Sequence, residues 1–159
     1  MEKSFLADVM LGRLARWLRI LGYDTLYARK GIDSVLIVRA YNDGRLILTR
    51  DSRLYRKLGS ERTFFIHADD FRDQLGELIR SLDMHHDPDR FLTRCLDCNQ
   101  PLVPIAKEDV RMVVPPFVYQ TVEAFRTCPR CRKVFWPGTH IGEMERLITT
   151  LFERKGTEE

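Results

Sequence analysis

Four cysteines, arranged as two short couplets, constrain the folding of this chain more than any other feature. The couplets are Cys95-Leu-Asp-Cys98 and Cys128-Pro-Arg-Cys131, and the 159-residue chain has no other cysteine. Each C-x-x-C turn presents two sulfurs to one ion, so two such turns complete a closed tetrahedral zinc site. The sequence therefore predicts a structural zinc site made by Cys95, Cys98, Cys128 and Cys131.

The alternatives are two redox couplets or two local disulfides. A thioredoxin-type couplet opens a helix in a βαβ unit, whereas both couplets here lie in irregular, proline-rich sequence. Asn99, Pro129 and Arg130 are suited to the tight turns of zinc knuckles. Residues 99–127 form a longer spacer than the shortest zinc ribbons have, so we expect the spacer to contain its own strands or hairpin.

Length and composition allow one domain with a real core, or one domain plus a small metal-held module. A hydrophobic share of 44% and a charged share of 31% are ordinary for a globular protein. No apolar run approaches the roughly 18 residues that a membrane span needs, and acids interrupt the N-terminus too early for a signal peptide. Cysteines reserved for metal, without a secretion signal, predict a cytoplasmic protein.

The net charge is +3, and the basic excess falls in the first 57 residues, which is weak evidence for a polyanion-facing surface there.

Short apolar runs alternate with helical patterns through the first 82 residues. The expected strands are 4–7, 25–28, 45–49 and 63–67, and the expected helices are 11–21, 34–41, 52–58 and 71–82. This order predicts an α/β fold with a mostly parallel sheet, right-handed crossovers and helices on both faces. We expect a sheet domain over residues 1–84, a linker over 83–90, the cysteine-bearing ribbon over 91–139, and a helix over 140–154 that packs on either module.

Acidic residues follow the strands of this predicted sheet. Asp8 ends the first strand, Asp33 follows the second, Asp51 follows the third, and Asp69 and Asp70 follow the fourth. Ligands of open α/β sheets bind beyond the carboxyl ends of the strands, and carboxylates gathered there suit Mg or Mn. Such a site can activate water against a phosphodiester. The alternative is that Asp33, Asp51, Asp69 and Asp70 are helix N-caps, which is the interpretation we favour for Asp69 and Asp70. It applies least to Asp8, which lies three residues before the expected helix.

Arginines accompany these acids. Arg13, Arg16 and Arg19 recur every third residue on the first helix, and Arg50 and Arg53 flank Asp51. Arginines placed in this way would hold a phosphate backbone without reading its sequence. The alternative is an ordinary solvated helix face.

Three blocks of the chain resemble the Mut-seven C-terminal RNase domain family. They are FLADVMLGRLARWLRILGYD at residues 5–24, GRLILTRD at 44–51, and VFWPGTHIGEM at 134–144, and the two cysteine couplets lie between the second and third blocks. The resemblance covers nearly the whole chain. It implies a PIN-like, three-layer nuclease domain with a zinc ribbon, which cleaves RNA with the help of a metal.

Carried over to this sequence, the resemblance implies that Asp8, Asp33 and Asp51 are the acidic positions that hold Mg or Mn. Ser52 would support a metal-bound water, and Asp69 or Asp70 is the candidate for a fourth acid. The sequence thus predicts a metal-dependent endoribonuclease, with RNA as substrate and with a ribosomal or protein partner for the ribbon left open.

Two other functions remain open at this point. A non-catalytic RNA- or ribosome-binding adaptor would bind RNA in a salt-sensitive way without needing divalent ions. A Mg-dependent phosphohydrolase of small esters fits less well, because Val9 and Met10 follow Asp8 where haloacid-dehalogenase-type enzymes have D-x-D.

Overall fold

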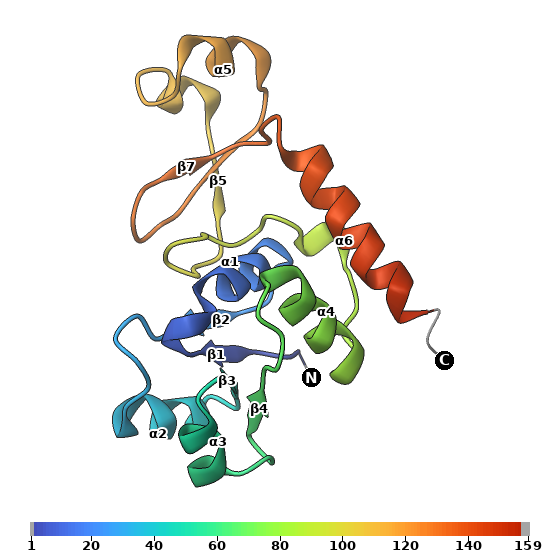
Figure 1. The fold of residues 1–159 in the computed structure, drawn as a ribbon. Helices are drawn as coiled ribbons and strands as arrows, with labels where there is room; N and C mark the ends of the chain where they lie inside the picture. The colour runs from blue at the N-terminus through green and yellow to red at the C-terminus, as the bar shows by residue number, and fades with distance from the viewer. Residues whose placement is uncertain (1, 157–159) are drawn as a thin grey trace.

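The computed structural model describes residues 2–156 and shows the predicted α/β architecture (Figure 1). Four parallel strands form one sheet in the order β2-β1-β3-β4. The strands are β1 (Phe5–Ala7), β2 (Thr25–Tyr27), β3 (Leu46–Thr49) and β4 (Thr63–Phe65). The helices that follow these strands along the chain are η1 (Val9–Leu11), α1 (Gly12–Ile20), α2 (Ser34–Asn42), α3 (Ser52–Leu58) and α4 (Phe71–Ser81).

Helices cover both faces of the sheet, as predicted. Successive residues of a strand point to opposite faces, so Phe5 and Ala7 face one layer and Leu6 faces the other. Phe5 and Ala7 belong to a core shared with α1 and α4, and Leu6 packs with Ile47 and the apolar side of α2. The result is a three-layer sandwich with α1 and α4 on one face and α2 and α3 on the other (Figure 1).

The order of the strands reverses between β1 and β3. The chain passes from β1 outward to β2, and from β3 outward to β4 on the other side. The carboxyl ends of β1 and β3, to the left in Figure 1, therefore flank the topological switch point where open α/β sheets bind ligands. Asp8 and Asp51 follow these two strands.

The segment over residues 83–90, expected to be a linker, is packed against the sheet module. Met84 is 1% exposed, the hydroxyl of Tyr23 donates to the carbonyl of His85 over 2.7 Å, and η2 (Pro88–Arg90) follows. Gly22 ends α1 with φ +87°, and a Cβ at this position would lie 2.4 Å from the carbonyl oxygen of Arg90. Glycine is required at position 22 both for its backbone conformation and for this close approach.

The cysteine-bearing module forms a second, antiparallel sheet in the order β5-β6-β7. Its strands are β5 (Val103–Ile105), β6 (Phe125–Thr127) and β7 (Val134–Phe135), and the spacer also holds η3 (Lys107–Val110) and α5 (Pro116–Thr121). We expected strands and turns here, and α5 is an addition. Pro116 occupies the first turn of α5, where a missing N–H costs nothing and the fixed φ favours a helix.

The final helix, α6 (Ile141–Lys155), packs on α4 of the sheet module. Its buried residues Ile148 and Leu151 join the core beneath α1 and α4. The chain thus returns from the cysteine module to the sheet module at its end (Figure 1). Among the helices of residues 2–156, none combines the length and the apolar character that a bilayer crossing requires.

Candidate functional site

The four cysteines form a cluster of metal-binding geometry. Their sulfur atoms all lie within 4.8 Å of one another, and the sulfurs of Cys95 and Cys131 are 3.7 Å apart. A tetrahedral zinc site with Zn–S bonds of about 2.3 Å has sulfur–sulfur edges of about 3.8 Å. A disulfide would need roughly 2 Å, and all four cysteines are free thiols. The cluster therefore fits zinc.

The two couplets adopt the same local structure. The N–H of Cys98 donates to the sulfur of Cys95 over 3.3 Å, and the N–H of Cys131 donates to the sulfur of Cys128 over 3.5 Å. The residue after each couplet has a left-handed backbone, with φ 66° at Asn99 and φ 64° at Arg132. Each couplet is therefore a knuckle that directs backbone N–H groups at its sulfurs.

The cysteine thiols differ in how easily they ionise. Burial raises the pKa of Cys95 to about 12. Burial also acts to raise the pKa of Cys128, but the N–H groups of Cys131 and Arg130 outweigh it and lower that pKa to about 7. Zinc binds thiolates, so metal binding at this cluster releases protons and weakens as the pH falls.

The first knuckle is fastened to the sheet module by side chains from both sides. The Asn99 side chain accepts from the N–H of Thr25 over 2.9 Å and donates to Asp24 over 2.6 Å. Burial alone would raise the pKa of Asp24, but hydrogen bonds from Arg45 and Asn99 bring it below its usual range. Asn99 therefore joins the metal site to the start of β2.

Arg19, which the sequence placed among the substrate-contacting arginines, is instead buried at 6% exposure. Its guanidinium donates to the carbonyl of Thr25 over 2.9 Å and to the carbonyls of Leu96 and Asp97 over 2.7 and 3.2 Å. Arg19 therefore holds the first knuckle against α1 and β2, and we leave it out of the surface proposed to contact RNA.

Asp8 and Asp51 are connected through one hydroxyl at the switch point of the sheet. Asp8 is 5% exposed, and its carboxylate accepts from the N–H of Val9 over 2.7 Å and from the hydroxyl of Thr49 over 2.8 Å. The same hydroxyl oxygen accepts from the N–H of Asp51 over 2.9 Å. Thr49 thus fixes the position of one aspartate relative to the other.

Four of the five aspartates cap helices, so the cap interpretation is confirmed for Asp33, Asp51 and Asp70 and is wrong for Asp69, which caps no helix of the described residues. Asp8, Asp33, Asp51 and Asp70 are the N-caps of η1, α2, α3 and α4. For Asp33 and Asp51 the capping bonds engage Oδ1, so Oδ2 of each exposed residue has no protein donor among the described residues. Capping therefore leaves one carboxylate oxygen of each for another ligand.

Ion pairing separates the five acids into two groups. Asp69 pairs with Arg50, and Asp70 lies 3.8 Å from Arg72. Within residues 2–156, Asp8, Asp33 and Asp51 have no ion pair with Lys, Arg or His. The described cysteines form the one tight cluster of three or more potential metal ligands, so these three aspartates are not gathered as closely.

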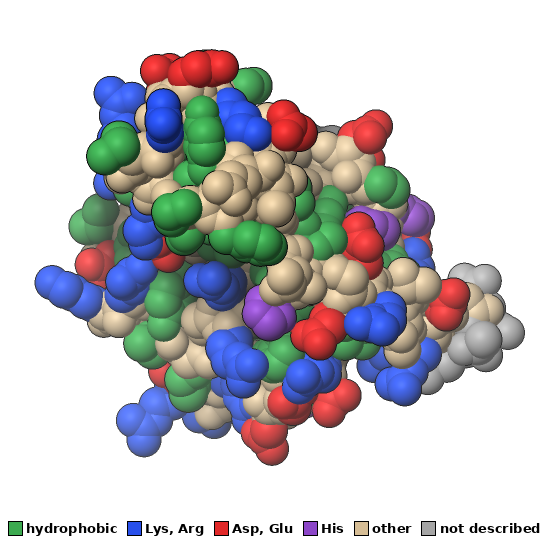
Figure 2. Space-filling view, turned by 90° about the horizontal axis from the view of Figure 1, so that it is seen from above, with side chains coloured by type: hydrophobic (Ala, Val, Ile, Leu, Met, Phe, Trp, Pro, Cys, Tyr) green, Lys and Arg blue, Asp and Glu red, His purple; other side chains and the backbone are tan. Residues whose placement is uncertain are grey.

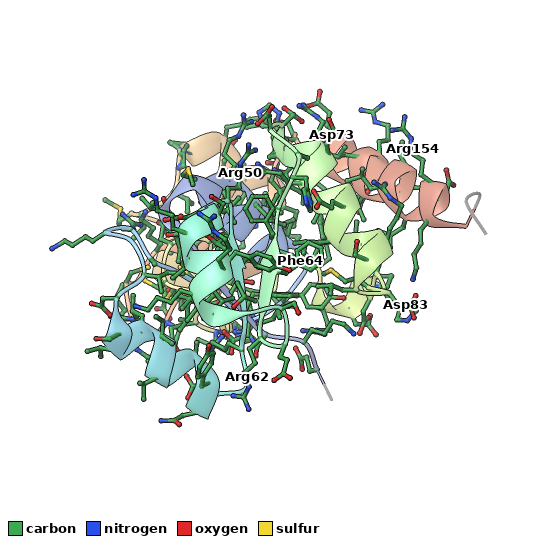
Figure 3. All side chains as sticks on the ribbon, turned by 60° about the horizontal axis from the view of Figure 1, so that its bottom comes forward. Arg50, Arg62, Phe64, Asp73, Asp83 and Arg154 are labelled. Atoms are coloured by element: carbon green, nitrogen blue, oxygen red, sulfur yellow. The ribbon has the colours of Figure 1, made fainter. Side chains whose placement is uncertain are left out.

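The remaining predicted residues surround this edge. Arg13, Arg16, Arg53 and Ser52 are exposed, and Ser52 is the first residue of α3, directly after Asp51. Arg50 is half-buried and binds both Asp69 and the carbonyl of Ala68. Figure 3 shows Arg50 toward the carboxyl end of β4 and Arg62 at its amino end. Arg50 therefore holds the β4–α4 loop at the same edge as the aspartates.

A surface hollow of about 310 Å³ lies at the starts of α1 and α4. Its lining includes Met10, Arg13, Asp69, Phe71 and Gln74, and the Arg13 guanidinium lies 4.2 Å from the centre of the Phe71 ring. The sequence analysis missed Phe71 and Gln74 here, and it also missed Thr49. The position of Thr49 at the end of a strand, two residues before Asp51, is the signal that could have found it.

Glu77 of α4 binds the loop between β4 and α4. Its carboxylate accepts from the N–H groups of His67 and Ala68, both over 3.1 Å, and from Nδ1 of His67 over 2.7 Å. Burial acts to raise the pKa of Glu77, but these hydrogen bonds outweigh it, and the pKa lies below the ordinary 4.5. The carboxylate form is therefore the one that stabilises this loop.

We predict that Glu77→Gln lowers the free energy of unfolding by about 1 kcal/mol at pH 7, because charged hydrogen bonds are exchanged for neutral ones. A depressed folded pKa contributes stability above pH 4.5, and this contribution is lost as the pH falls through the folded pKa. The difference between wild type and variant, measured by urea unfolding, should shrink below pH 4.5. Glu145→Gln, at an exposed site on α6, is the matched control, and an equal effect there would remove the loop from the explanation.

The comparison with known proteins identifies the family of the chain. No curated protein matches the chain. A family described as the Mut7-C RNAse domain matches residues 3–148, which include the sheet, all four cysteines and the three aspartates. The match covers nearly the whole chain and, together with the parallel sheet and the cysteine cluster, leads to one conclusion: the chain belongs to the Mut7-C RNase domain family.

Proposed function

We propose that this protein is a metal-dependent endoribonuclease. The observation that carries the proposal is the position of Asp8, Asp33 and Asp51 beyond the strand ends, without a cationic side chain paired to any of them in residues 2–156. Asp69 and Asp70, at the same edge, do have cationic neighbours. Unpaired carboxylates at such an edge suit Mg²⁺ or Mn²⁺, which prefer carboxylate oxygens and keep several waters.

The donor set fits such an ion. A bound Mg²⁺ or Mn²⁺ would activate water, orient a phosphodiester and stabilise the leaving oxyanion. Asp8, held by Thr49 and the N–H of Val9, would be the most rigidly placed of the three ligands. Asp33 and Asp51 would each supply the oxygen that their helices do not use, and the Ser52 hydroxyl would hold a water.

Arginines would place the RNA in this proposal. Arg13, Arg16 and Arg53 are exposed and would contact phosphates, whereas Arg50 would act by holding the β4–α4 loop. The hollow beside Arg13 and Phe71 offers room for a nucleotide next to the cleaved bond. The zinc ribbon would be structural, and free zinc-binding thiols suit the reducing cytoplasm.

One observation favours a second function, that of a non-catalytic RNA-binding or ribosome-binding adaptor. The three aspartates are less closely gathered than the cysteines. This spacing suits an adaptor, because an adaptor would need no metal ion at that edge of the sheet. It predicts salt-sensitive RNA binding that does not respond to Mg²⁺ or to changes at the aspartates.

The test is cleavage of a closed circular RNA, which has no ends for an exonuclease. We expect zinc-loaded protein to cleave it only with added Mg²⁺ or Mn²⁺. Asp51→Asn should cleave at least tenfold more slowly while keeping its melting temperature, because asparagine caps a helix as well as aspartate does.

The matched control is Asp43→Asn, an exposed acid at the C-terminus of α2 and thus near the opposite edge of the sheet. It should cleave at the wild-type rate. Cleavage that needs no divalent ion, or that is equal in the Asp51 and wild-type proteins, would overturn the enzymatic proposal. RNA binding without cleavage in all three proteins would support the adaptor.

A further inference from the structure

The hairpin that carries the second zinc knuckle is strongly basic. Arg126, Arg130, Arg132 and Lys133 are exposed, and no acid lies between positions 126 and 133. The nuclease proposal does not use these four cations. Cationic side chains on a loop are often simply solvated. Whether these four can bind a ligand therefore depends on where the fold places the hairpin.

The fold fixes this hairpin in place at two levels. Cys128 and Cys131 join it to the metal cluster, and Lys133 forms an ion pair with Asp97 inside the first couplet. The first knuckle is in turn bound to α1 and β2 by Arg19 and Asn99. The hairpin is therefore a rigid extension of the sheet module.

The first knuckle, which holds the hairpin, contacts the end of α1 and the start of β2, about one length of α1 from the aspartate edge. In Figure 1 both knuckle loops, yellow-green and orange, lie to the left, where β1 ends. The contact between Arg19 and the first knuckle is seven residues along α1 from Gly12, or about 10 Å at 1.5 Å per residue. A few nucleotides of an extended strand cover that span.

Further cations fill the interval between the hairpin and the aspartates. Arg16 lies one turn from Arg19 on α1, and Arg29 and Lys30 are exposed in the loop that leads to Asp33. Figure 2, which views the molecule from above, shows Lys and Arg side chains over its left and lower parts, with some Asp and Glu side chains among them.

We propose that the basic hairpin, defined as residues 126–133, binds the phosphates of the RNA strand on its way to the aspartate edge. The inference rests on the proposed function for what happens at that edge, and it gives the zinc ribbon a role in holding substrate. Arginines on a rigid hairpin position a phosphate backbone without reading its bases, which suits an RNA strand of any sequence.

The test compares two double variants in RNA binding. Arg130→Gln with Arg132→Gln removes two cations of the hairpin, and glutamine is no more strained than arginine at the φ of 64° of position 132. The control is Arg56→Gln with Lys57→Gln, in the last turn of α3 at the opposite end of the sheet module. Binding of fluorescent single-stranded RNA is measured by anisotropy in a divalent-free buffer without chelator, across a salt series, with zinc content checked for each protein.

We expect the hairpin variant to bind RNA about tenfold more weakly at 0.1 M salt. The slope of log affinity against log salt should fall by about 1.4, from about 0.7 per lost phosphate contact on a single strand. In the cleavage assay KM should rise while kcat at saturating RNA stays the same. The control pair should change neither affinity nor slope.

The outcomes separate this inference from the nuclease proposal. If the hairpin variant binds RNA more weakly but the wild-type protein never cleaves RNA, the hairpin remains an RNA-binding surface and the nuclease proposal is overturned. Unchanged affinity and salt slope would overturn the inference, even in an active nuclease, and would leave an acidic protein as the ligand to test next.

Discussion

Cys95→Ser should release zinc and unfold the cysteine module, residues 91–139, while the sheet module stays folded. Beside its four cysteines, the module has a core of only three buried residues, Val110, Val114 and Phe125. A module of this size depends on its metal, because structural zinc supplies about 10–16 kcal/mol in zinc-finger peptides. Loss of one thiolate removes most of that stabilisation.

Hydrogen exchange, read at the backbone amides of β6 and of β3, is the measurement. The amides of β6 should lose their protection in Cys95→Ser and in chelator-treated wild type, and those of β3 should keep it. Added zinc should restore protection to the treated wild type and not to the variant, which serves as the control. A variant that keeps one bound zinc per chain and a protected β6 would show that the cluster does not hold the module together.

Asp8→Asn should reduce divalent-dependent RNA cleavage by at least about 100-fold and leave the fold and the zinc content intact. An ion that loses its most rigid carboxylate ligand forfeits several kcal/mol of transition-state stabilisation, and each 1.36 kcal/mol is tenfold in rate. The fold should survive because the asparagine oxygen can still accept from Val9 and its amide can donate to Thr49. The Thr49 hydroxyl donates to the Asp8 carboxylate and accepts from the N–H of Asp51. An asparagine amide group cannot accept the hydroxyl proton, and the loss of this hydrogen bond costs about 1 kcal/mol.

Binding of Mn²⁺, followed by electron paramagnetic resonance, gives a readout besides activity, and it should weaken in step with cleavage. Asp83→Asn is the matched control, because Asp83 is exposed at the end of α4 far along the chain from the site, and its φ of 48° is one that asparagine tolerates. Wild-type cleavage by Asp8→Asn would remove the catalytic role of this edge. If cleavage is lost while Mn²⁺ binding is unchanged, the ion binds at another place and Asp8 acts in cleavage in some way other than as its ligand.

The predictable part of the fold was its alternation of elements. The expected helix over 52–58 matches α3 residue for residue, and the other elements of the sheet module differ from expectation by a few residues at their ends. Apolar periodicity and glycine stops carry that information locally. Residues 83–90 look like a linker because they are polar, and only the tertiary structure shows Met84 filling the core.

The predictable part of the site was the placement of acids after strands. The roles of the arginines were harder to predict, because a spacing of three turns each residue about 60° around the helix from the previous one. Arg13 and Arg19 therefore point about 120° apart, and Arg19 turns inward to the first knuckle while Arg13 reaches the surface hollow. Thr49 stayed hidden because a threonine at the end of a strand is usually only a strand residue.

Zinc content and the condition of the first helix are linked in this protein. Two of the three carbonyls that accept from the Arg19 guanidinium, those of Leu96 and Asp97, belong to the first knuckle. We expect this knuckle to lose its shape when its metal is removed. A cell short of zinc would thus leave a cation inside the protein with fewer acceptors, on the helix that starts four residues beyond Asp8. The supply of zinc would then affect the stability of α1 and of its packing on the sheet.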